Sequence, residues 1–156
     1  MKKVIFTFAI IFAAFRGYSQ NPVAVGQMQL NAGGGFSSNG IPIYVGLDYG
    51  IHKDVTIGGE ASFRLDGSDN GSNGLGILAN GNYHFNSLLK MPTKYGFYAG
   101  ANVGFHMDLG DGDSSGLSLG LQVGGRYYFN EKFGLNLEFG GGNYTSGGKI
   151  GISLKF

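Results

Sequence analysis

The feature that most constrains the fold of this chain is a strict alternation of apolar and polar side chains. It is clearest in residues 116–140, GLSLGLQVGGRYYFNEKFGLNLEFG. The apolar positions of the first half are Leu117, Leu119, Leu121, Val123, Tyr127 and Phe129, and those of the second half are Phe133, Leu135, Leu137 and Phe139. The polar residues 130–132 separate the two halves. Because alternate side chains of a strand lie on opposite faces of a sheet, this stretch predicts a β-hairpin with long arms.

The same alternation recurs along most of the chain, separated by stretches rich in Gly, Asp, Ser and Asn. Apolar rows occupy residues 28–36, 41–51, 55–65, 75–85, 95–107, 117–129, 133–139 and 150–156. The connection 86–94, which contains Leu88, Leu89 and Met91, fits the pattern least well. Eight strands joined to their neighbours, with no helix, predict an all-β fold: an eight-stranded antiparallel up-and-down barrel.

Composition indicates which face of this barrel is outside. Charged residues make up 13% of the chain, about half the share typical of a soluble domain, and 31 residues are Gly. The polar rows consist mainly of Gly, Asn and Ser, which suits a crowded lumen, whereas a soluble lipocalin-like carrier needs a charged outer face. The charged strand residues all fall in the polar rows: Asp48, Glu60, Arg64, Arg126, Glu138, Lys149 and Lys155. The apolar rows are therefore predicted to face lipid, and a secreted lipocalin-like carrier is the alternative outside the membrane class.

The N-terminal residues form a separate segment. Lys2 and Lys3 precede an apolar run over residues 4–15, and small residues follow near Ser19. This order is typical of a secretory signal peptide, and the run is too short to span a bilayer as a helix. We expect a signal peptide over residues 1–19, a short lead over 20–24 and the barrel over 25–156.

The aromatic residues are predicted to mark the two membrane interfaces. If both ends of the barrel chain lie at the periplasmic rim, one group forms a girdle there: Tyr49, Tyr83, Phe85, Tyr95, Phe97, Tyr127, Phe129, Phe133 and Phe156. A second group lies toward the opposite rim: Phe36, Phe63, Phe105 and Phe139. Two aromatic girdles are characteristic of transmembrane barrels.

In this pattern, and in its alternating C-terminal segment ISLKF, the chain resembles the small eight-stranded outer-membrane proteins of Gram-negative bacteria, which include OmpX and the barrel of OmpA. The resemblance covers about residues 25–156. It implies a monomer in the bacterial outer membrane, surrounded by outer-membrane lipid. It also implies that Ile152, Leu154 and Phe156 form the signal for the barrel-assembly machinery, and that the outer loops offer a surface to a partner.

The lumenal charges are the candidate site. Glu60, Arg64, Arg126, Glu138 and Lys155 are predicted to form a charge network inside the barrel. Arg126 and Glu138 lie on neighbouring strands of one hairpin and are expected to reach each other diagonally, with Glu60 joining them across the lumen. Such a network either compensates buried charge in a closed lumen or gates a narrow path for ions or small solutes. The closed lumen is favoured because side chains just fill an eight-stranded barrel.

Two loop patterns suggest metal binding only weakly. Residues 66–71 match the start of a calcium loop, but Ile77 stands where a bidentate Glu is needed. Asp108, Asp111 and Asp113 form a second acidic loop. Both are typical of solvated turns, so no metal or cofactor is predicted.

Catalysis and nucleic-acid binding are not expected either. His106, Asp108 and Ser114 contain the residue types of a lipid-modifying enzyme, which is the enzymatic alternative. Three such residues near one loop arise readily by chance, so we predict no enzyme. A net charge of +1 without a basic cluster gives no indication of nucleic-acid binding.

Overall fold

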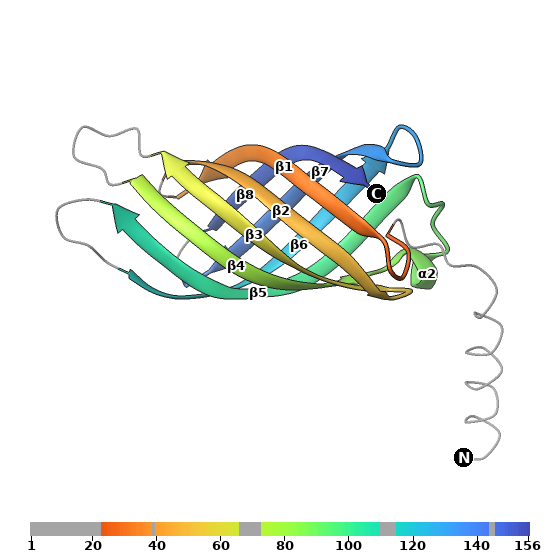
Figure 1. Ribbon diagram of the computed structural model, residues 1–156, viewed down its shortest axis with the longest axis horizontal. Coiled ribbons are helices and arrows are strands. Elements are labelled where there is room, and N and C mark those ends of the chain that lie inside the picture. Colours follow the sequence, from red (N-terminus) through yellow and green to blue (C-terminus); the bar gives the residue numbers. More distant parts are fainter. Residues whose placement is uncertain (1–22, 39, 66–72, 110–114, 144–145) are drawn as a thin grey trace, which may run out of the picture.

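The chain forms a closed β-barrel. The structure is a computed structural model that describes residues 23–38, 40–65, 73–109, 115–143 and 146–156. Each strand pairs antiparallel with the next, and β1 pairs with β8 to close the wall (Figure 1). The strands are β1 (Met28–Ser37), β2 (Ile41–His52), β3 (Val55–Leu65), β4 (Asn73–His84), β5 (Tyr95–Leu109), β6 (Ser115–Tyr128), β7 (Phe133–Gly142) and β8 (Ser146–Lys155). The predicted eight-stranded up-and-down barrel is confirmed.

Within the described residues, the predicted absence of helix is wrong in the connection between β4 and β5. The connection between β4 and β5 contains the short helix α2 (Asn86–Leu89). The Leu89 amide donates to the Phe85 carbonyl at 2.8 Å, and Lys90 ends the helix with a left-handed φ of 52°. A single helical turn is too short to impose a 3.6-residue period on the sequence, so periodicity could not reveal it.

The barrel is apolar outside and polar inside. Leu121 and Phe105, which point outward, are 70% and 69% exposed. Among the described residues, the buried apolar or aromatic side chains are those of Val23, Tyr44, Tyr98 and Tyr128. An exterior of this kind requires an apolar solvent, and it is the reverse of a lipocalin-like carrier, whose apolar rows face inward. The outward orientation of the apolar rows is confirmed.

Both ends of the barrel chain lie at one rim. The Met28 amide donates to the Phe156 carbonyl at 3.1 Å, and the Phe156 amide donates to the Met28 carbonyl at 3.0 Å. The turn 53–54, the turn 129–132 and α2 lie at this same end, which we call the terminal rim (Figure 1). The connections 38–40, 66–72, 110–114 and 143–145 join strands at the opposite end, the loop rim.

The N-terminal segments are described only in part. The predicted signal peptide 1–19 and the first residues of the lead lie outside the described residues. From Val23 onward the lead packs at the terminal rim: the Gly26 amide donates to the Gly50 carbonyl at 2.8 Å. Within the described part of the chain, no helix is long and apolar enough to cross a bilayer.

Candidate functional site

A buried ion pair crosses the lumen in its terminal half. Arg126 on β6 donates from Nη2 to Asp48 Oδ2 on β2 at 2.6 Å, and the two side chains are 3% and 2% exposed. Asn31 also donates to Asp48 Oδ2, at 2.9 Å. The Arg126 guanidinium lies 4.4 Å from the centroid of the Tyr98 ring. The two opposite charges compensate each other, and the contacts with Asn31 and Tyr98 replace part of the hydration that the two groups lose on burial.

The predicted pairing of Arg126 with Glu138 is not what the structure shows. The two residues are diagonal neighbours, as expected, because Arg126 is opposite Asn136 and Glu138 is opposite Gly124 in the ladder between β6 and β7. Their ion pairs in the described structure are nevertheless with Asp48 and with Lys149. Arg126 instead reaches across the lumen to Asp48. Sequence reasoning placed Asp48 in the polar row but sought the partner of Arg126 on the neighbouring strand, whereas β2 and β6 are far apart in the sheet.

Glu138 belongs to a second cluster, together with Glu60 and Lys149. Lys149 Nζ lies 2.8 Å from a carboxylate oxygen of Glu60 and 2.8 Å from one of Glu138. The expectation that Glu60 joins Glu138 from across the lumen therefore agrees with the geometry. The Lys149 ammonium connects them: Glu138 is its direct neighbour in the ladder between β7 and β8, and Glu60 reaches it from β3. Sequence reasoning placed Lys149 in a polar row but did not include it in the charge network.

Aromatic hydroxyls connect this cluster to the rest of the lumen. The Tyr98 hydroxyl donates to Glu138 Oε2 at 2.7 Å, and the Tyr44 hydroxyl donates to Asn136 Oδ1 at 3.0 Å. The Tyr98 ring lies against β6 where an inward side chain would clash: a Cβ at Gly124 would overlap the ring. Glycine at this position thus makes room for the largest fully buried side chain of the lumen.

The remaining predicted charges lie at opposite ends. Near the loop rim, Arg64 Nη2 lies 2.5 Å from Asp108 Oδ1. Near the terminal rim, Lys155 Nζ lies 4.0 Å from the Tyr128 ring centroid, and the Tyr128 hydroxyl is hydrogen-bonded to the Gln29 side chain. The five predicted residues thus do not form one network: Glu60 and Glu138 share the Lys149 cluster, whereas Arg64, Arg126 and Lys155 each have other partners.

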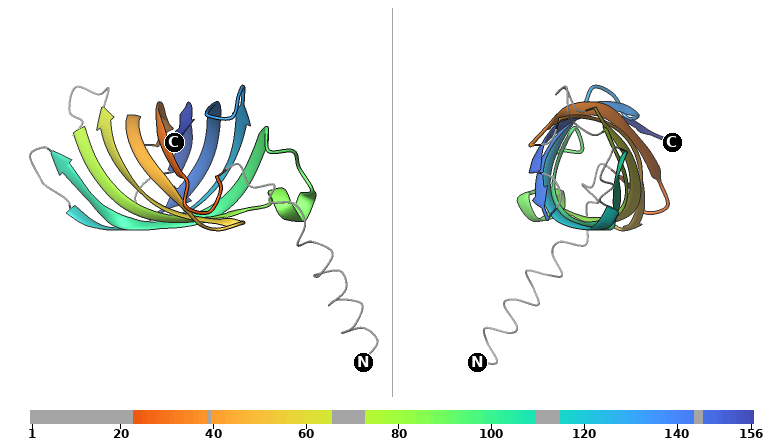
Figure 2. Two further views of the ribbon diagram at one scale, coloured as in Figure 1. Left: turned by 45° about the vertical axis from the view of Figure 1, so that its right-hand side comes forward. Right: turned by 90° about the vertical axis from the view of Figure 1, so that its left-hand side faces the viewer.

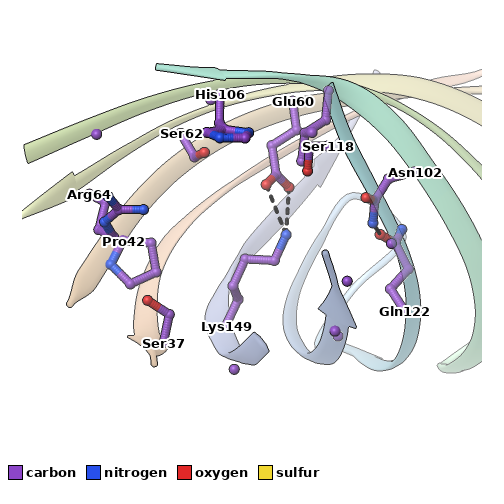
Figure 3. Close-up of a pocket in the computed structure, with 18 of the residues that line it drawn as sticks. Ser37, Pro42, Glu60, Ser62, Arg64, Asn102, His106, Ser118, Gln122 and Lys149 are labelled. Carbon is purple, nitrogen blue, oxygen red and sulfur yellow. Dashed lines mark hydrogen bonds and ion pairs between the residues drawn. The ribbon is translucent and has the colours of Figure 1, made fainter. Parts of the chain in front are cut away.

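Between the Arg64 layer and the Lys149 cluster lies a cavity of about 120 Å³. Ser62, His106, Ser118, Asn102 and Gln122 line it, and Glu60 and Lys149 meet within it (Figure 3). A further void, of about 10 Å³, lies around Asp48, Tyr98 and Arg126 and has room for at most one water molecule. Of these two spaces in the described structure, the larger thus lies toward the loop rim, and the lumen around Asp48 and Arg126 is closely packed.

The residues considered for catalysis or metal binding do not assemble into such a site in the described structure. The Asp108 carboxylate engages Arg64, and His106 stands beside Gly116 of β6. Ser114, Asp111, Asp113 and residues 66–71 lie outside the described residues. Among those described, no group of three or more His, Cys, Asp or Glu side chains is placed to hold a metal ion.

The residues predicted for the girdle point outward at the terminal rim, and most of them touch one another. Ring centroids lie 5.2 Å apart for Tyr83 and Phe85 and 5.7 Å apart for Phe85 and Phe97. In a second group, the ring centroids lie 5.4 Å apart for Tyr95 and Tyr127, 5.3 Å for Tyr127 and Phe129, and 5.8 Å for Phe129 and Phe133. Tyr49 and Phe156 are 44% and 61% exposed. Ile152 and Leu154, predicted to belong to the assembly signal, also face outward, at 46% and 41% exposed.

Solved structures match this barrel over nearly all of its described length. The N-terminal barrel domain of OprF from Pseudomonas aeruginosa has a TM-score of 0.67 and 17% sequence identity, covering 85% of this chain and 98% of that one. OprG from the same organism has a TM-score of 0.64 and 12% identity, covering 87% and 99% of the two chains. Neisserial surface protein A has a TM-score of 0.60 and 16% identity, covering 83% and 94%.

The chain has the fold of the small eight-stranded outer-membrane β-barrels. The apolar exterior is what that fold requires in an outer membrane, and the resemblance stated from the sequence is confirmed at the level of fold. No protein-family model matches the chain, and no curated protein matches it.

Proposed function

We propose that the protein is an integral outer-membrane barrel with a closed lumen, and that its role is structural or concerns interactions at the cell surface. The observation that carries this proposal is the packing of the lumen. Asp48 and Arg126 bridge the terminal half of the barrel, where Tyr98 and Tyr128 are also buried, at 0% and 2% exposed. A hydrated ion needs an unobstructed polar path, and the terminal half of this lumen offers none.

The connections at the loop rim are the surface available to an external partner. Short turns favour the terminal rim as periplasmic, which leaves the loop rim outside. Residues 38–40, 66–72, 110–114 and 143–145 together contain Asp66, Asp69, Asp111 and Asp113, but no Lys or Arg. A partner with cationic or neutral polar groups would suit this composition better than a polyanion, because like charges repel.

A narrow channel is the second candidate, and the cavity of about 120 Å³ is the observation that favours it. A path would have to continue from this cavity past Lys149, Tyr98 and Arg126. In the closed-lumen proposal the cavity is instead a dead end that holds water.

Two measurements test the proposal together. Protein from an outer-membrane fraction is expected to change its gel mobility in SDS when it is boiled, as a detergent-resistant barrel does. In planar bilayers it is expected to produce no discrete conductance steps, while an open porin measured in parallel does. Discrete steps whose size changes in Lys149→Ala would establish the channel instead, and recovery in the soluble fraction without a mobility shift would refute the membrane assignment.

A further inference from the structure

The connection between β4 and β5 presents large apolar side chains outside the barrel wall. Leu88 and Leu89 of α2 are 61% and 55% exposed. Viewed along the barrel, α2 lies beside the wall and not across the opening of the lumen (Figure 2, right). These leucines therefore neither close the lumen nor contribute to a protein core.

The connection is held in a fixed position. Asn86 is fully buried; its Nδ2 donates to the Tyr95 carbonyl at 2.5 Å, and its Oδ1 accepts from the Phe97 amide at 3.3 Å. The Met91 amide donates to the Asn86 carbonyl at 2.9 Å. A loop that is merely solvated does not need a buried side chain anchored to the next strand. The exposed position of the leucines is thus built into the fold.

The leucines continue the apolar exterior of the barrel. Phe85 immediately precedes α2, and its ring contacts those of Tyr83 and Phe97, both of which are on the outward face. The outward face is the lipid-facing surface of this fold. The connection therefore extends that surface beyond the ends of the strands, at the level where polar headgroups meet acyl chains.

The charges of the connection complement a phospholipid headgroup. Residues 85–94 include Lys90 and Lys94 but no acidic residue. Both lysines are exposed, and Lys94 Nζ lies 5.0 Å from the centroid of the outward-facing Tyr127 ring. Apolar side chains beside lysines, at the edge of a lipid-facing surface, are typical of segments that lie in the membrane interface.

We propose that the connection 85–94 is a membrane foot: Leu88 and Leu89 insert at the boundary of the acyl chains, and Lys90 and Lys94 bind the phosphates of anionic phospholipids in the adjacent leaflet. The inference rests on the proposed function, because it requires the barrel to be surrounded by lipid. It adds a site of lipid binding at one sector of the terminal rim.

The absence of Trp from the chain allows the depth of the foot to be measured directly. Leu89→Trp introduces one Trp, and the protein is folded into vesicles of phosphatidylcholine and phosphatidylglycerol in which some acyl chains are brominated. Two matched variants bracket the result: Leu121→Trp, at an outward position 70% exposed, and Lys53→Trp, on the tight turn at the same rim. Each variant is first checked for the boiling-dependent gel shift, so that only folded barrels are compared.

In the Leu89→Trp variant we expect blue-shifted emission and strong quenching by shallow brominated chains, while Lys53→Trp emits as a water-exposed Trp. If Leu121→Trp is quenched but Leu89→Trp emits like Lys53→Trp, the proposed insertion of the connection 85–94 into the membrane is refuted. If Leu121→Trp also escaped quenching, the membrane-barrel proposal itself would fail.

A second comparison tests the lysines. Quenching of Leu89→Trp is measured in two vesicle samples with the same mixture of phosphatidylcholine and phosphatidylglycerol. In one sample the phosphatidylglycerol carries the bromine, and in the other an equal mole fraction of phosphatidylcholine carries it. Each lysine is expected to favour the anionic lipid about fivefold, which corresponds to about 1 kcal/mol at low salt. Lys90→Gln with Lys94→Gln should abolish the preference, whereas Lys53→Gln with Lys132→Gln, at the same rim, should retain it. Equal quenching by the two lipids, or a preference unchanged without Lys90 and Lys94, would refute headgroup binding.

Discussion

Asp48→Asn is expected to destabilise the barrel strongly, because it leaves the Arg126 guanidinium charged inside the lumen. At the observed separation of 2.6 Å, and with an effective dielectric constant of about 20, the charges attract by about 6 kcal/mol. Part of this survives the substitution, because the amide oxygen introduced at position 48 can still accept a hydrogen bond from the guanidinium, which contributes about 2–3 kcal/mol when one partner is charged. We therefore expect the free energy of unfolding to fall by about 3–4 kcal/mol, within the range found when one partner of a buried pair is removed.

The companion variant separates charge compensation from packing. Asp48→Asn combined with Arg126→Met removes both charges while retaining side chains of similar length. We expect this double variant to regain most of the lost stability, so the coupling between the two positions should be about 3 kcal/mol. Lys53→Gln is the matched surface control: its pair with Asp54 is 3.5 Å long, its side chain is 42% exposed, and its loss should cost less than about 1 kcal/mol.

The assay is equilibrium urea unfolding in phospholipid vesicles. The folded fraction is read from the gel-mobility shift and from tyrosine fluorescence. Two results would refute the reasoning: an Asp48→Asn barrel within about 1 kcal/mol of the parent, or a double variant whose loss equals the sum of the single losses.

Three further predictions use the same unfolding assay. Gly124→Ala should cost about 1–3 kcal/mol because the new Cβ would overlap the Tyr98 ring, whereas Gly81→Ala, whose Cβ would meet nothing within 4 Å, should leave stability unchanged or slightly higher. Lys149→Gln leaves two carboxylates without the ammonium between them; it should cost about 3–5 kcal/mol, most of which should be regained when Glu60→Gln and Glu138→Gln are added, and a triple variant no more stable than Lys149→Gln would contradict this. Asn86→Ala should cost about 1–3 kcal/mol and accelerate tryptic cleavage of the connection that it anchors, and an unchanged cleavage rate would argue against the anchoring role.

The positions of strands and the direction of each side chain followed from the sequence because a strand has a period of two. The row from Leu117 to Phe129 predicted β6, and the inward position of Arg126 followed from the same alternation. No comparable signal existed for α2, since a four-residue helix flanked by strands has no periodic pattern of its own. The buried anchor Asn86 was likewise indistinguishable from an ordinary loop asparagine.

The partners inside the lumen were decided only by the closed barrel. Alternation assigns Asp48, Arg126, Glu138 and Lys149 to one face, and the pairing of adjacent strands limits which neighbours can meet. Contacts across the lumen depend instead on the stagger of all the strands together, because that stagger sets the height at which each inward side chain stands. The sequence by itself thus determined an eight-stranded barrel with charge inside and apolar surface outside. Only the tertiary structure decided that Arg126 meets Asp48 and that Lys149 reaches Glu60 as well as its cross-strand neighbour Glu138, since the contacts with Asp48 and Glu60 join strands that are not adjacent in the sheet.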